Sequence, residues 1–196
     1  MDVGSKLRLT SILSALVALT VALAACGDDD GEATATGPLT LNGEETVLAL
    51  DSTTAKVLDK GKVAISPVDP SSVGGEGIGF PIVGGEIDAE SLAGTIDHAG
   101  GIKFSSGGAR VKLTDFVVDT EAGTLTATTP EGPDLLMLDL DLRGLERSDE
   151  GGEIVLSGIA ATLSDDGATA LNKAFDVELF EGGLAMGEVT VTATAI

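Results

Sequence analysis

Few residues in this 196-residue chain could carry out acid–base, nucleophilic or metal chemistry. It has one cysteine, Cys26, one histidine, His98, and no tyrosine or tryptophan. A histidine can act as a general base or contact a metal, but a structural zinc site usually needs several nitrogen or sulfur ligands. No Gly-x-Ser-x-Gly elbow supports a Ser-His-Asp triad. We therefore expect no enzyme and no metal site. His98 is the candidate ligand-binding residue, and a polar loop residue beside a tight turn is the alternative.

Two acidic segments match a calcium loop only in part. Asp139 and Asp141 have the right spacing, but Arg143 occupies a position that should supply an oxygen ligand. Leu140 and Leu142 alternate with them as in a strand, so we expect both aspartates on its solvent face. The stretch 27–37 is acidic but lacks the spaced oxygen ligands of a calcium loop.

Charge and composition exclude several classes of protein. The chain has 11 Lys+Arg against 32 Asp+Glu, a net charge of −21, so the basic footprint of a nucleic-acid-binding protein is missing. Hydrophobic residues make up 43%, which excludes a wholly disordered chain and suffices for one buried core. The single cysteine excludes a disulfide within the chain. We expect one domain with an acidic surface and no nucleic-acid partner.

The N-terminus has the features of a targeting segment. Lys6 and Arg8 precede an uncharged run that ends at Ala25, as in a secretory signal peptide. The end of this run, Leu-Ala-Ala-Cys26, resembles the lipobox of bacterial lipoproteins. The resemblance implies a diacylglyceryl group with palmitate-type chains on Cys26 and removal of residues 1–25. The alternative is an uncleaved anchor, for which a run of about 17 residues is at the lower limit.

Lipidation of Cys26 would hold the protein at the extracytoplasmic face of the cell membrane, because two or three acyl chains anchor stably. Without residues 1–25, the chain keeps 9 basic and 31 acidic residues, a net charge of −22. Residues 26–38 are acidic and small, which predicts a flexible tether. The folded domain is then expected over residues 39–196.

Apolar and polar residues alternate in many short runs of this domain, and Gly-Gly pairs or acidic-Gly steps separate them. Such spacing predicts an all-β fold, which we expect to be an antiparallel β-sandwich-like domain with one or two short helices. The main runs are 39–41, 47–50, 80–82, 95–98, 102–104, 111–119, 124–128, 136–142, 154–159 and 189–194.

Two segments instead have helical spacing and a capping residue at their start. These are 51–60 and 164–173. An alternating run follows each of them, at 63–65 and at 177–179. The pattern is either an internal helix–strand repeat or a chance match of a few positions.

The scarcity of aromatic residues disfavours sugar stacking and aromatic-cage recognition, since binding hot spots favour Trp, Tyr and Arg. Five phenylalanines lie within apolar runs, so we expect them in the core. A pocket lined by Leu, Val and Phe for an apolar ligand is an alternative. The phenylalanines are Phe80, Phe104, Phe116, Phe175 and Phe180.

The middle of the chain resembles a known family. The segments Phe80–Asp88, Gly94–Phe104 and Val111–Asp119 are similar to the HtaA-type domain of actinobacterial exported and surface proteins. The resemblance implies a β-rich extracytoplasmic domain. Its characterised members bind haem and pass it toward import machinery, with a tyrosine that ligates the iron and a histidine in support. This chain has no tyrosine, and His98 alone lies near the family's histidine motif.

Together these observations predict an exported lipoprotein that carries a non-catalytic, HtaA-like ligand-binding module. Haem is the ligand that the resemblance implies, and an apolar ligand is the other candidate. The alternative function is a structural envelope lipoprotein that binds a protein partner and no small ligand.

Overall fold

The computed structural model describes residues 37–130 and 132–196. The predicted signal peptide, the predicted lipidation site Cys26 and most of the predicted tether lie outside these residues. The described residues all belong to one compact unit. Within the described ranges, neither helix is long and apolar enough to cross a membrane.

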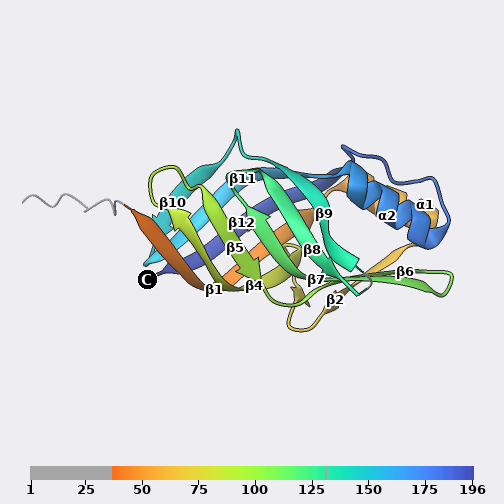
Figure 1. The fold of residues 1–196 in the computed structure, drawn as a ribbon, viewed down its shortest axis with the longest axis horizontal. Coiled ribbons are helices and arrows are strands. Elements are labelled where there is room, and N and C mark those ends of the chain that lie inside the picture. The colour runs from red at the N-terminus through yellow and green to blue at the C-terminus, as the bar shows by residue number, and fades with distance from the viewer. Residues whose placement is uncertain (1–36, 131) are drawn as a thin grey trace, which may run out of the picture. The chain divides into compact units, whose positions relative to one another are not determined.

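The described residues are mostly strand, with two short helices (Figure 1). The predicted all-β class and the predicted helices are therefore confirmed. The elements in chain order are β1 (Pro38–Leu50), α1 (Ser52–Gly61), β2 (Ala64–Val68), β3 (Ser72–Val73), β4 (Ile78–Asp88), β5 (Gly94–His98), β6 (Gly101–Ser106), β7 (Ala109–Asp119), β8 (Thr124–Thr129), β9 (Gly132–Asp141), β10 (Glu146–Glu150), β11 (Glu153–Leu163), α2 (Asp165–Phe175) and β12 (Ala185–Ala195).

The strands close into a barrel, so the expected sandwich is wrong. Eight strands pair in the order β7-β5-β4-β1-β12-β11-β9-β8, and the pairing of β8 with β7 closes the ring. β10 adds to β11 and β3 adds to β4 outside the ring. A sandwich and a barrel produce the same alternation of apolar and polar residues. They differ in which strands are neighbours, and one neighbouring pair of this barrel, β1 with β12, joins segments distant in the sequence.

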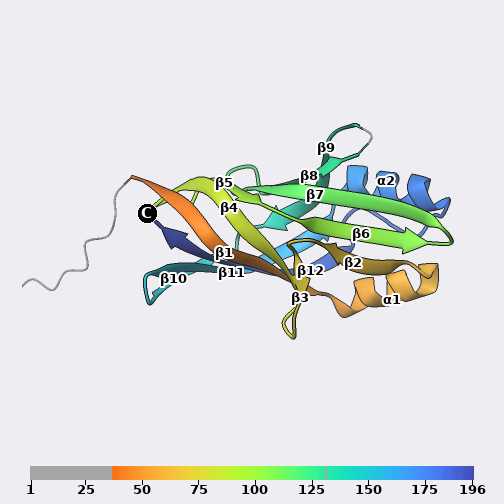
Figure 2. The same ribbon diagram turned by 90° about the horizontal axis from the view of Figure 1, so that it is seen from below.

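Three strands extend beyond one end of the barrel, and we call them the ribbon: β2, the central strand β6, and β7 over residues 109–114. β5 and β6 pair one after the other along the same edge of β7. On its other edge, β7 pairs with β8 only from Thr114 to Asp119. Both helices lie at the ribbon end, whereas β1 starts at the opposite end of the barrel (Figure 2).

Each helix begins at a capping residue, as expected from the sequence. The Asp51 carboxylate accepts a hydrogen bond from the Thr53 amide at the start of α1. At the start of α2, the Ser164 hydroxyl oxygen accepts from the Gly167 amide at 2.9 Å. The same hydroxyl donates to the Leu136 carbonyl at 2.8 Å, which fastens α2 to β9.

The proposed helix–strand repeat does not hold in full. β2 follows α1, but residues 177–179 after α2 form no strand. There the side chain of Asn172 accepts from the amides of Leu179 and Phe180, both at 3.0 Å, and donates to the Phe180 carbonyl at 2.7 Å. These bonds replace a strand partner and hold the segment as a loop against α2.

Side chains fill the barrel, as is usual for eight strands. Four of the five phenylalanines are buried and Phe175 is half-buried. The rings of Phe80 and Phe116 pack edge to face, 5.0 Å between centroids. The space left among these apolar side chains is about 30 Å³, roughly the volume of one water molecule. A small-molecule ligand therefore has no room inside the barrel.

Candidate functional site

His98 is the last residue of β5 and points into the barrel, where it is 4% exposed. Its Nε2 lies 2.7 Å from the hydroxyl oxygen of Thr46 on β1, and its Nδ1 lies 3.0 Å from the carbonyl oxygen of Phe116 on β7. His98 is thus a strand residue inside the barrel, and not a loop residue beside a turn.

The two partners determine which nitrogen of His98 carries the proton. A carbonyl oxygen only accepts, so Nδ1 must donate to Phe116. Burial lowers the pKa of His98, although the bond to Phe116 and the charge of Asp97 act in the opposite direction. The neutral ring then has Nε2 as an acceptor, which takes the hydroxyl proton of Thr46. Both nitrogens are therefore occupied within the protein.

Phe116 accepts this bond because of an irregularity in β7. The ladder between β7 and β6 ends at Thr114, and the ladder between β7 and β5 begins at Val117. Asp115 between them has a positive φ of 51°, a conformation that few non-glycine residues adopt. The Phe116 carbonyl is thereby left without a ladder partner on these strands, and the imidazole supplies one.

A groove outside the barrel has room for a small molecule. We call it the α2 groove. It lies where β7 has passed the end of its pairing with β8, and α2 packs against β7 and β9 beside it. Its volume is about 350 Å³, which is within the usual range for small-molecule pockets. Its lining residues are Arg110, Val111, Lys112, Thr129, Pro130, Leu135, Ala170, Lys173 and Ala174.

The lining of the α2 groove combines an apolar floor with positive charge. Val111 and Leu135 are half-buried and form part of the floor. Arg110, Lys112 and Lys173 are exposed at its sides. No carboxylate is among the lining residues, although acidic residues outnumber basic ones threefold in the chain as a whole. The groove thus suits an apolar molecule that carries a negative group.

The sequence analysis did not identify this groove. A signal was present, because residues 99–114 contain no aspartate or glutamate in a chain that has 32 of them. That stretch contains two of the three basic groove residues, Arg110 and Lys112. Lys173 comes from a helix some 60 residues later, so its place beside them could not be read from the sequence.

Comparisons with known proteins identify the fold. No family model matches the chain, and no curated protein matches it. The crystal structure of the C-terminal domain of HtaA from Corynebacterium glutamicum matches with a TM-score of 0.62 and 16% identity, over 81% of this chain and 99% of that domain. The chain has the HtaA-type fold. The resemblance drawn from residues 80–119 is thus confirmed for the fold.

Two further structures from the same organism match less closely. The heme binding protein HtaB matches with a TM-score of 0.47 and 10% identity, over 81% of this chain and 96% of HtaB. A domain-swapped dimeric variant of the HtaA domain matches with a TM-score of 0.48 and 16% identity, over 74% of this chain and 94% of that domain. The part of this chain that matches HtaA spans nearly all of a domain solved by itself. The described residues therefore correspond to a domain that has been solved by itself.

The HtaA-type residues present here do not fit ligation of haem iron by a side chain. The chain has no tyrosine, and both nitrogens of His98 are occupied inside a filled barrel. No histidine, cysteine or methionine lines the α2 groove. Within residues 37–130 and 132–196, no group of three or more His, Cys, Asp or Glu is placed to hold a metal ion. The groove can receive the apolar and carboxylate parts of such a ligand but offers no bond to its iron.

Proposed function

We propose that this protein is a membrane-tethered, non-catalytic binding module with the HtaA-type fold, and that the α2 groove is its ligand site. The observation that carries the proposal is the composition of the groove. Three exposed basic side chains surround an apolar floor, in a protein with 32 acidic residues and only 11 basic ones.

The ligand class follows from that composition. An apolar body would lie on Val111 and Leu135, and one or more carboxylates would pair with Arg110, Lys112 and Lys173. Arginine in particular binds carboxylates through two parallel hydrogen bonds. Porphyrins, including haem, have such a body with carboxylates at one edge. Because the groove lining has no iron ligand, we propose that the porphyrin binds with or without its metal.

The position of the groove agrees with a role in capturing a ligand outside the membrane. Lipid on Cys26 would place the start of β1 toward the membrane, since only the short tether separates them. β1 starts at the end of the barrel opposite α2 (Figure 1). The groove would then face away from the lipid, toward molecules that arrive from outside.

The test is a titration of residues 34–196 with haemin and, separately, with metal-free protoporphyrin IX, followed by absorbance and porphyrin fluorescence. We expect saturable binding of both with similar affinity. The variant Ala174→Trp fills the groove and should weaken both by about tenfold or more. Thr169→Trp places the same bulk on an exposed position of α2 outside the groove lining, and it should leave both affinities unchanged.

Three results would overturn the proposal. One is the absence of binding by protein shown to be folded by circular dichroism. Another is binding that Ala174→Trp does not affect, which would place the ligand elsewhere. The third is binding of haemin alone, which would show that a protein–iron bond is needed after all.

A further inference from the structure

The outer face of the ribbon carries a second concentration of positive charge. Lys103 on β6 and Lys112 on β7 are directly opposite each other in the ladder, and Arg110 lies two residues from Lys112 on the same face. Lys62, the C-terminal cap of α1, borders this face. We call these four residues the ribbon cations.

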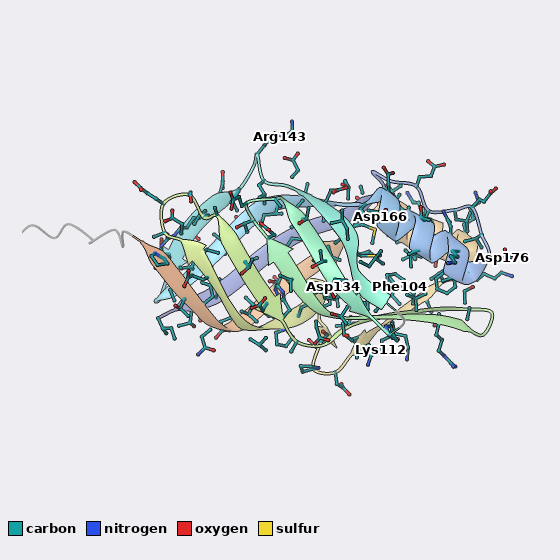
Figure 3. The ribbon with its side chains drawn as sticks, in the orientation of Figure 1. Phe104, Lys112, Asp134, Arg143, Asp166 and Asp176 are labelled. Carbon is teal, nitrogen blue, oxygen red and sulfur yellow. The ribbon has the colours of Figure 1, made fainter. Side chains whose placement is uncertain are left out.

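Lys62, Lys103 and Arg110 line a shallow hollow of about 420 Å³, and its other lining residues are all small. Lys112 lies opposite Lys103 in the ladder but does not line the hollow. Ser66 is the ladder partner of Lys103, and Ser105 is the partner of Arg110. Neither residues 60–68 nor residues 99–114 contain an acidic residue. Lys112 marks this end of the molecule in Figure 3. The hollow therefore combines space, hydroxyl groups and positive charge with no negative charge from its own strands.

The charges on this face are not compensated by the ion pairs that the structure describes. Those pairs join Arg143 to Asp141 and Arg147 to Asp149, and Figure 3 shows Arg143 on another side of the barrel from Lys112. Two lysines directly opposite in a sheet repel each other and cost stability. A bound anion would turn this repulsion into attraction.

Protection of an edge strand does not explain the arrangement. Lysines on edge strands prevent sheets from joining, and Lys112 lies on such an edge. Lys103, however, lies on β6, which is paired on both sides, with β2 and with β7. A half-buried lysine at the centre of a three-stranded ribbon protects no edge, so a ligand is the better explanation for its place beside Lys112.

The chemistry of the hollow indicates which anion would bind. Protein partners are usually held by large aromatic or arginine anchors in apolar pockets, but the lining here is Ala, Ser and Gly between the cations. Neighbouring strands are about 5 Å apart and alternate residues of one strand about 7 Å apart. The cations therefore form a row that can contact several closely spaced charges at once. We propose that the outer face of the ribbon binds a linear phosphate polymer.

The acidic remainder of the protein does not prevent this contact. At physiological ionic strength, charges more than about 8 Å apart are largely screened, so the local cations determine the interaction. The ribbon also lies at the end of the barrel away from the start of β1. In a tethered protein, this face would be presented to polymers beyond the membrane. Arg110 and Lys112 also line the α2 groove, whereas Lys62 and Lys103 do not. Variants of Lys62 and Lys103 therefore test this face separately from the groove.

The test uses residues 34–196 and sodium polyphosphate as the probe, with binding followed by calorimetry at several salt concentrations. We expect saturable binding whose logarithmic affinity falls as the logarithm of salt rises. The double variant Lys62→Glu/Lys103→Glu should lose about tenfold or more in affinity. The control Lys56→Glu/Arg143→Glu makes the same change in net charge at exposed positions outside the hollow. It should bind as the wild type does.

Further probes exclude other kinds of partner. If polyglutamate binds as well as polyphosphate, the face recognises acidic protein and the proposal is wrong. If only vesicles of phosphatidylglycerol and phosphatidylcholine bind, the face is a membrane contact and the proposal is wrong. Absence of polyphosphate binding, or equal losses in the two double variants, would also overturn it. Porphyrin titration of the Lys62→Glu/Lys103→Glu variant reports separately on the α2 groove and should match the wild type.

Discussion

The Nε2 atom of His98 lies 2.7 Å from the hydroxyl oxygen of Thr46, although 52 residues separate them and β4 lies between their strands. Through Nδ1 the same ring reaches the Phe116 carbonyl on β7. One imidazole thus joins β1, β5 and β7 inside the barrel. The predicted ligand residue has a described role in holding strands together, and its part in ligand binding stays a prediction.

Replacement of His98 by alanine should destabilise the domain by about 2–4 kcal/mol, because it leaves a cavity and two buried polar partners without hydrogen bonds. Urea denaturation of His98→Ala against wild type measures this directly. Thr46→Val keeps the shape of Thr46 and removes only its hydroxyl, so it should cost less. Folded His98→Ala protein should still bind protoporphyrin IX. Unchanged stability together with lost porphyrin binding would instead make His98 a ligand residue.

The buried imidazole should make stability fall as the solution becomes mildly acidic. Burial holds the pKa of His98 in the folded protein below its ordinary value of 6.5. In mildly acidic solution the unfolded chain therefore binds a proton at this histidine more readily than the folded protein does. Unfolding is therefore favoured as the pH drops below the pKa of His98 in the unfolded chain. Above that pKa, the neutral buried ring makes its full contribution to the free energy of unfolding. Between about pH 7.5 and 5.5, where few carboxylates titrate, the unfolding free energy of wild type should fall more steeply than that of His98→Gln. Parallel curves for the two proteins would contradict the assignment.

The helix α2 forms one wall of the α2 groove, and its N-terminal cap is Ser164. Ser164 is 2% exposed, and its hydroxyl both accepts from the Gly167 amide and donates to the Leu136 carbonyl. Ser164→Ala should cost about 1–2 kcal/mol in urea denaturation and should weaken porphyrin binding. Asp51→Ala removes the equivalent cap of α1, which lines no part of the groove. It should lower stability but leave porphyrin affinity unchanged, and equal losses of affinity would argue against the groove.

The sequence by itself determined the local elements, because their signals are local. Alternation over 111–119 and 136–142 reports strands with one buried face, and the structure has strands there. The capping residues Asp51 and Ser164 marked both helix starts. The alternation of Leu140 and Leu142 with Asp139 and Asp141 correctly favoured a strand over a calcium loop. Each of these features depends on residues within a few positions of one another.

Only the tertiary structure decided how these elements pair and what they enclose. The closed barrel requires β1 to meet β12, the last strand, as well as β8 to meet both β7 and β9. Alternation specifies which face is buried but not which strand is the neighbour. The surroundings of His98 and the α2 groove likewise depend on contacts between segments distant in the sequence. His98 is buried because Thr46 and Phe116 meet it from distant strands, and the α2 groove exists because Lys173 packs beside a ribbon formed 60 residues earlier. Such neighbours are set by the fold as a whole, so no local pattern records them.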